Sequence, residues 1–136
     1  MKILGIEHIG IAVKDVGKSG SFWGQVLSIG QSGEDRIEEQ GVDTKIYNTS
    51  RGKIELLESL RADSVIARFI DKKGEGIHHI CLEVEDIRAA IKELQTAGID
   101  LIYNEPRIGA EGFLITFIHP KAAGGVLVEL AQAPGH

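Results

Sequence analysis

The chain has one cysteine, Cys81, among 136 residues, so no disulfide can form within it. A lone cysteine is typical of proteins from a reducing compartment. No apolar run approaches the roughly 20 residues that a membrane-spanning helix needs, so we expect no membrane partner. The first residues also lack the pattern of a signal or transit peptide. These features predict a cytoplasmic protein.

The acidic and basic residues are dispersed along the chain and form no long cluster of one charge. The 15 Lys and Arg stand against 20 Asp and Glu, and nothing forms the basic stripe of a nucleic-acid-binding protein. We therefore expect no nucleic-acid partner. The sequence also lacks HExxH, paired CxxC and GxxxxGK[ST] motifs, so its glycine clusters at 74–76, 109–112 and 124–125 are interpreted as turns.

The most informative feature is an internal repeat. Residues 6–17, IEHIGIAVKDVG, align without a gap with residues 77–88, IHHICLEVEDIR, which matches His8 with His79. The end of each half supports the alignment, because KIELL resembles LVELA and Glu55 then matches Glu129. Each half therefore begins with a histidine strand and ends with a glutamate strand.

Alternation along these strands places the four side chains opposite an aliphatic stripe, because successive residues of a strand point to opposite faces. The stripe consists of Ile9, Ile11, Val13, Ile54, Leu56, Ile80, Leu82, Val84, Val128 and Leu130. Around His8 the other face carries the small residues Gly10 and Ala12. Such a face is typical of a partly polar cleft.

Helix signals follow each histidine strand. Asp86 is a predicted N-cap and Gly98 a predicted helix end, and Asp15 is the matching N-cap of a first helix that glycines weaken. This order predicts an α+β fold in which two tandem βαβββ modules form a curved mixed sheet around a metal-binding cleft.

The length of 136 residues suits one compact domain, residues 1–136, and 43% hydrophobic residues are enough to form a single core. We expect module 1 at about residues 3–60, a linker helix at 62–73, and module 2 at about residues 76–133.

Two imidazoles and two carboxylates suit a divalent cation such as Co, Ni, Mn, Zn or Fe and leave coordination positions for a substrate. Each residue also has a simpler interpretation, since a strand histidine is often structural and a strand glutamate is often solvated. The repetition of both at matched positions favours the metal site. Glu129 also lies in the apolar run GVLVELA, where an unpaired carboxylate would be costly.

The neighbours of His79 are less suitable ligands. His78 must face the other side of the strand, and the repeat aligns it with Glu7, so we interpret it as a structural or surface residue. Cys81 shares the face of His79 but lies further along the strand, and we expect it not to be a ligand. His119 and Lys121 are predicted to lie in a turn, where an anionic group could bind.

Several motifs together resemble the vicinal oxygen chelate (glyoxalase/bleomycin-resistance) superfamily and, within it, the methylmalonyl-CoA epimerases. The motif HIGIAV at His8 is general to the superfamily. More specific are residues 39–42 (EQGV), 76–87 (GIHHICLEVEDI), 118–121 (IHPK) and 125–130 (GVLVEL). The resemblance covers nearly the whole chain.

The resemblance implies an enzyme that interconverts (R)- and (S)-methylmalonyl-CoA by C2 proton abstraction through a metal-stabilised enolate. It implies that His8, Glu55, His79 and Glu129 hold a divalent metal, with Co2+ preferred and Mn2+, Ni2+ or Zn2+ as alternatives. It also implies Glu39 and Glu129 as the two bases and a homodimer. Some epimerases carry Gln where this chain has Glu55, a departure that bears on metal preference more than on reaction class.

Two rival functions remain at this point. A glyoxalase I-like lactoylglutathione lyase would use the same ligands, and a metal-free small-molecule-binding protein of the same fold would need none of them. The motifs at residues 39–42 and 118–121 favour the epimerase. Six basic residues are candidates for the CoA phosphates, although most are expected to be solvated: Arg51, Lys53, Arg61, Lys72, Lys73 and Lys121.

Overall fold

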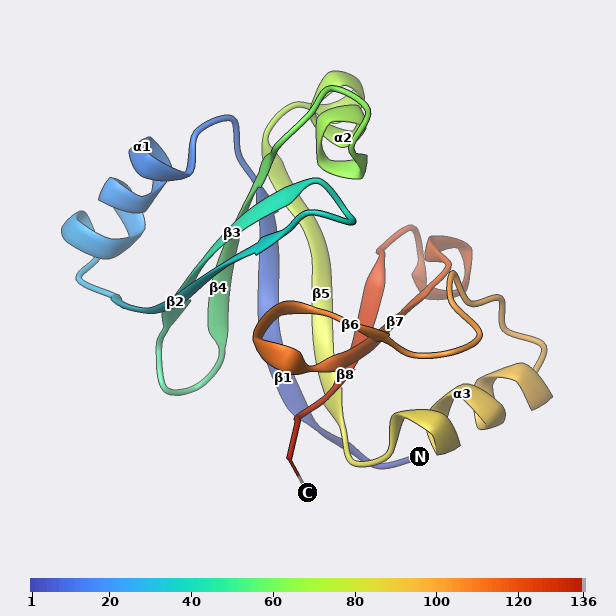
Figure 1. Ribbon diagram of the computed structural model, residues 1–136. Coiled ribbons are helices and arrows are strands. Elements are labelled where there is room, and N and C mark those ends of the chain that lie inside the picture. The colour runs from blue at the N-terminus through green and yellow to red at the C-terminus, as the bar shows by residue number, and fades with distance from the viewer. Residues whose placement is uncertain (136) are drawn as a thin grey trace. The chain divides into compact units, whose positions relative to one another are not determined.

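The computed structural model describes residues 1–135 and divides them into two compact units. One unit comprises residues 8–78, and the other comprises residues 1–7 together with residue 79 onward. Strand β1 (Ile3–Ala12) has residues in both units. Figure 1 labels the helices and strands of the chain. None of the helices within residues 1–135 is long and apolar enough to cross a lipid bilayer.

After β1, the unit of residues 8–78 has a helix that continues into a π-helical turn, then three strands, and then a second helix. Its sheet order is β2-β3-β4-β1, with β1 parallel to β4 and the other neighbours antiparallel. In chain order its elements are helix α1 (Val16–Gly20), the π-helical turn η1 (Ser21–Val26), strands β2 (Gly30–Ile37), β3 (Val42–Asn48) and β4 (Lys53–Ser59), and helix α2 (Val65–Lys73).

The other unit repeats this plan. Strand β5 is parallel to β8, and β8, β7 and β6 follow one another as antiparallel neighbours. Its elements are strand β5 (Gly76–Val84), whose first three residues belong to the unit of residues 8–78, helix α3 (Ile87–Thr96), strand β6 (Arg107–Ile108), the 3-10 turn η2 (Ala110–Gly112), strand β7 (Leu114–Ile118), the 3-10 turn η3 (Pro120–Ala123) and strand β8 (Val128–Gln132). The predicted α+β fold with a repeated βαβββ order is confirmed.

Matching aspartates begin the first helix of each unit. The Asp15 carboxylate accepts hydrogen bonds from the N–H groups of Gly17 and Lys18, and the Asp86 carboxylate accepts one from Ala89. Both aspartates satisfy N–H groups that have no partner inside a helix. After α3, Gly98 takes a positive φ of 76° and ends the helix as predicted.

Most of the aliphatic stripe of each half lies in the core of its own unit. In residues 8–78, Ile11, Val13, Ile54 and Leu56 pack with Tyr47 and with residues of α1 and η1. In the other unit, the corresponding residues of β5 and β8 pack against α3: Leu82, Val84, Val128 and Leu130. The alternation of side chains along the strands therefore predicted correctly that these residues face the core.

The opposite strand face is also partly covered. Ala12 and Leu57 pack against Ile66 of α2, and Cys81 and Ala131 pack with Ile115. The histidine and glutamate side chains thus share their strand faces with buried apolar residues, which lowers the access of water to them.

Candidate metal centre

The first His–Glu pair lies on the parallel strands β1 and β4. Glu55 is the register partner of Gly10, and His8 precedes Gly10 by two residues and so shares its face. His8 Nδ1 lies 3.0 Å from Glu55 Oε2, and both residues are only 5% exposed. Buried carboxylates are costly without a partner, so this histidine compensates the burial of Glu55.

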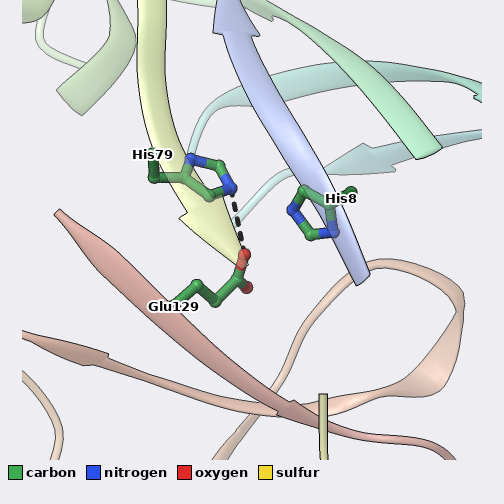
Figure 2. A group of neighbouring side chains, drawn as sticks. All are labelled: His8, His79 and Glu129. Carbon is green, nitrogen blue, oxygen red and sulfur yellow. Dashed lines mark ion pairs between the residues drawn. The ribbon is translucent and has the colours of Figure 1, made fainter. Parts of the chain in front are cut away.

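The second pair lies on the parallel strands β5 and β8. Glu129 is the register partner of Cys81, and His79 precedes Cys81 by two residues. His79 Nε2 lies 3.0 Å from Glu129 Oε1, an ion pair drawn as a dashed line in Figure 2. His79 is 5% exposed and Glu129 is 7% exposed. An unpaired carboxylate in this apolar strand would be costly, and the contact with His79 gives Glu129 a partner.

The two pairs have the same construction. In each, a histidine precedes the register partner of the glutamate by two residues on a parallel neighbouring strand. The spacing in sequence differs, 47 residues from His8 to Glu55 and 50 from His79 to Glu129, because the segments that join the strands differ in length. The register is nevertheless identical, so the repeat extends from sequence to strand pairing, although the first pair meets through Nδ1 of its histidine and the second through Nε2.

The surroundings of His79 and His78 differ. The His79 ring makes an edge-to-face contact with Phe117, with 5.8 Å between centroids. His78 faces the other way and makes an edge-to-face contact with Phe69 of α2 at 5.0 Å. His78 thus has a packing role in residues 8–78, as the alternation of the strand predicted.

Glu39 lies on a different kind of element from the four paired residues. It is exposed and occupies the turn of residues 38–41, between β2 and β3. Its neighbour Glu38 accepts a hydrogen bond from Arg36 Nε at 2.8 Å. This contact also raises the pKa of Arg36, first through the hydrogen bond and then through the charge of Glu38.

Two of the basic residues suggested for phosphate binding have partners within the chain. Lys121 Nζ lies 2.5 Å from Asp100 Oδ2, and this hydrogen bond, followed by the lysine charge, lowers the pKa of Asp100. Arg61 donates to Asp63 and to two backbone carbonyls of the turn that carries Glu39. Sequence patterns did not indicate the Arg61 contacts, because backbone acceptors more than 20 residues away leave no spacing signal.

The donor chemistry of the two pairs fits a divalent transition metal. Imidazole nitrogen and carboxylate oxygen are common ligands of Zn2+, Co2+, Mn2+ and Fe2+. All four side chains are buried, as expected for ligands shielded from bulk water. Cys81, by contrast, is fully buried in an apolar cluster with Ile115 and Ala131, which suits a packing role.

Comparison with known proteins identifies similar sequences over most of the chain. Residues 7–117 match the family model of the glyoxalase/bleomycin resistance protein/dioxygenase superfamily. The human protein named methylmalonyl-CoA epimerase, mitochondrial, is 43% identical over 129 residues, which cover 94% of this chain and 73% of the human protein.

Solved structures agree with the sequence comparison. Methylmalonyl-CoA epimerase from Mycobacterium tuberculosis has a TM-score of 0.94 at 35% identity, covering 98% of this chain and 90% of that one. A variant of Streptomyces coelicolor methylmalonyl-CoA epimerase in complex with 2-nitronate-propionyl-CoA has a TM-score of 0.92 at 34% identity, covering 98% of this chain and all of that one. Both similarities extend beyond the superfamily model to nearly every residue.

Proposed function

Since the chain belongs to the methylmalonyl-CoA epimerases of the glyoxalase/bleomycin resistance protein/dioxygenase superfamily, we propose that it interconverts (R)- and (S)-methylmalonyl-CoA. The observation that carries this proposal beyond similarity is the pair of buried His–Glu contacts, made in the same register in each half. An acyl-CoA substrate is supported by the relative that was solved with an acyl-CoA analogue.

We assign His8, Glu55, His79 and Glu129 as ligands of one divalent metal, with Co2+ preferred and Mn2+, Ni2+ or Zn2+ as alternatives. The support is the burial of all four residues and the preference of such cations for imidazole and carboxylate donors. When bound, the cation would supply positive charge near the thioester oxygen, where negative charge develops as C2 loses its proton.

Two carboxylates move the proton in this proposal. Inversion at C2 requires a base on each face of the planar enolate, and we assign Glu39 to one face and Glu129 to the other. One carboxylate takes the C2 proton as the C–H bond breaks and its electrons enter the enolate. The other carboxylic acid then delivers a proton to the opposite face, and C2 is restored with inverted configuration.

His79 and Glu129 stay neighbours in this scheme, as ligands of the same cation. Without a cation, the 3.0 Å contact between His79 Nε2 and Glu129 Oε1 holds the Glu129 carboxylate in a site with little water. When a cation is bound, it would take over this positioning, because one imidazole nitrogen cannot donate to a carboxylate and coordinate a metal at once.

The proposal is tested by incubating each epimer separately in D2O with metal-loaded protein. We expect the C2 hydrogen to be replaced by deuterium and the configuration to invert, as followed by NMR and by chiral analysis of the acyl group. Absence of both processes in a folded, metal-loaded sample, relative to a protein-free control, would rule out the epimerase.

Variants of the turn test the assignment of the second base. Glu39→Gln should abolish inversion and stop hydrogen loss from one epimer only, since Glu129 still exchanges the proton on its own face. Glu38→Gln is the adjacent control, because the Glu38 carboxylate is held by Arg36. If Glu38→Gln gave the selective loss instead, the base would be Glu38.

The rival lyase makes a different prediction. A glyoxalase I-like enzyme would convert the hemithioacetal of methylglyoxal and glutathione to lactoylglutathione, and we expect no such conversion. A metal-free binding protein would bind methylmalonyl-CoA without exchange. One sample assayed with both substrates therefore separates the three functions.

We further propose a homodimer in the cytoplasm. The dimer is supported by exposed aliphatic side chains on the first part of β1, where Ile3, Leu4 and Ile6 are 44–60% exposed. A second copy of the chain would remove them from water. Native mass spectrometry at micromolar concentration should give twice the chain mass of 14.7 kDa.

A further inference from the structure

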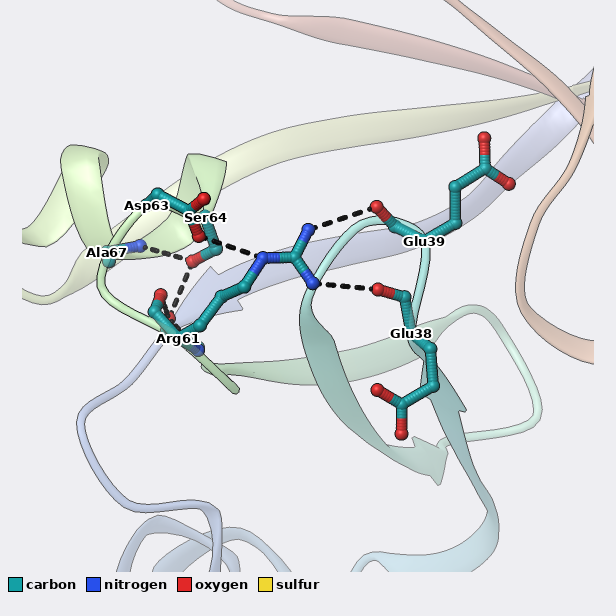
Figure 3. A network of polar contacts seen from close by, with 7 residues as sticks. Glu38, Glu39, Arg61, Asp63, Ser64 and Ala67 are labelled. Atoms are coloured by element: carbon teal, nitrogen blue, oxygen red, sulfur yellow. Dashed lines mark hydrogen bonds and ion pairs between the residues drawn. The ribbon is translucent and has the colours of Figure 1, made fainter.

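We propose that Arg61 is a positioning residue that fixes the turn of residues 38–41 and thereby directs the carboxylate of Glu39. The inference rests on the proposed role of Glu39 as a base. Arg61 Nη1 donates to the carbonyl oxygen of Glu38 at 2.9 Å, and Nη2 donates to that of Glu39 at 3.2 Å (Figure 3). One planar guanidinium thus holds two successive carbonyl groups of the turn.

The guanidinium is itself held in place. Arg61 Nε donates to Asp63 Oδ1 at 2.8 Å, so all three nitrogens of its head group have acceptors. The backbone of Arg61 is also tied down, because its carbonyl accepts a hydrogen bond from Ser59 Oγ. Ser59 Oγ in turn contacts Ser64 Oγ, which caps α2 through the N–H of Ala67. The turn is thereby connected to the start of a helix.

Gly41 makes room for this contact. A Cβ atom at Gly41 would lie 3.0 Å from Arg61 Cζ, and the φ of Gly41 is +67°, a conformation that glycine adopts without strain. The Gly41 carbonyl also accepts a hydrogen bond from the N–H of Leu60 at 2.7 Å. The turn is therefore held to the segment after β4 on two sides, by a backbone hydrogen bond and by the guanidinium.

The consequence concerns the direction of the two glutamate side chains. In Figure 3 the carboxylates of Glu38 and Glu39 extend to opposite sides of the turn, and neither points at the guanidinium. Arg61 holds the backbone from which both side chains project. A rotation of this backbone would move the exposed Glu39 carboxylate away from its position, and misplacement by about 1 Å can cost about a hundredfold in rate.

The test measures hydrogen loss in D2O from each epimer separately. The epimer that Glu39→Gln blocks identifies the Glu39 face. Arg61→Ala should slow exchange of that epimer about tenfold to a hundredfold and leave exchange of the other epimer within about twofold of wild type. Arg61→Lys keeps the charge but cannot reach three acceptors in one plane, so we expect the same selective loss.

Arg36→Ala is the matched control. It removes an arginine next to the same turn, but one that contacts the Glu38 side chain rather than the backbone, and both epimers should exchange at nearly wild-type rates. Gly41→Ala disturbs the same contact from the other side, because its Cβ would press on the Arg61 guanidinium. It should give the same selective loss, and it replaces the Arg61 variants if these fold poorly.

The outcomes separate the two proposals. No exchange in wild type would rule out the epimerase assignment and, with it, the role of Arg61 in that reaction. Exchange in wild type with an equal loss of both epimers in the Arg61 variants would overturn the positioning role alone. Wild-type behaviour of Arg61→Lys would show that charge, rather than the planar set of donors, is what the turn requires, and would also overturn it.

Discussion

At the scale of single residues, burial of the two carboxylates explains why each glutamate has a histidine partner. Glu55 and Glu129 are 5% and 7% exposed, and an ionised carboxylate with so little water around it needs a compensating group. Removing one partner of a buried pair commonly costs about 3–5 kcal/mol, because the other is left uncompensated. The histidines therefore contribute to folding as well as to any metal site.

The adjacent histidines allow a controlled test of this role. His79→Ala should abolish binding of one metal per chain and lower the melting temperature, because Glu129 loses its partner. His78→Ala should keep the metal, since its ring faces the other side of the strand and packs against Phe69. Metal content by elemental analysis of the purified variants is the measurement. Equal retention of metal by the two variants would contradict the assignment.

Sequence reasoning separated these two histidines because strand alternation is strict. The repeat selected His79, and the structure gives His79 the carboxylate partner. Glu39 could not be found in this way. It lies in a turn, where no periodicity relates it to β1 or β4, and only the family motif singled it out. Residues on regular strands were thus predictable from pattern, whereas a turn residue was not.

At the scale of elements, the first helix shows why local propensity gives an incomplete account. Its glycines predicted a weak helix, and the structure has a five-residue α1 followed by a π-helical turn. Gly20 and Gly24 lie against the buried Tyr47, where a Cβ would come within 2.4 Å of the hydroxyl oxygen and within 2.9 Å of Cε1, respectively. Close packing against this ring explains glycines that propensity alone would disfavour.

This packing predicts an effect opposite to helix propensity. Alanine in place of an ordinary helical glycine stabilises by up to about 1 kcal/mol, but Gly20→Ala should destabilise by about 1–3 kcal/mol because it overpacks the site. Chemical denaturation measures the change in free energy of unfolding. Tyr47→Phe should relieve Gly20→Ala, whose clash is with the hydroxyl, but should not relieve Gly24→Ala, whose clash is with the ring. Stabilisation by Gly20→Ala would refute the packing explanation.

The least regular segment was also the least predictable. Between α3 and β7 the chain forms an isolated bridge from Leu101 to Ile118, the two-residue strand β6 and the short turn η2, in which Glu111 has a positive φ of 57°. Two residues are too few to display a period-2 pattern. The strands β1, β4, β5 and β8 could be predicted because they are long and apolar on one face.

At the scale of the whole molecule, the repeat and the family similarity support different proposals about the site. The repeat supports the metal ligands, because the same His–Glu register occurs in both halves. The proposed substrate rests on the similarity to methylmalonyl-CoA epimerases. The boundaries of the two modules, the choice of metal and the dimer remain predictions.

We propose that the two His–Glu pairs serve one metal, and the number of metal ions bound per chain distinguishes one shared site from two separate sites. Native mass spectrometry of wild type loaded with Co2+ should give one metal ion per chain. His8→Ala and His79→Ala, each removing a ligand from a different half, should both abolish its binding. Two metal ions per chain in wild type, with each variant losing only one of them, would show that the pairs are separate sites and would contradict the account.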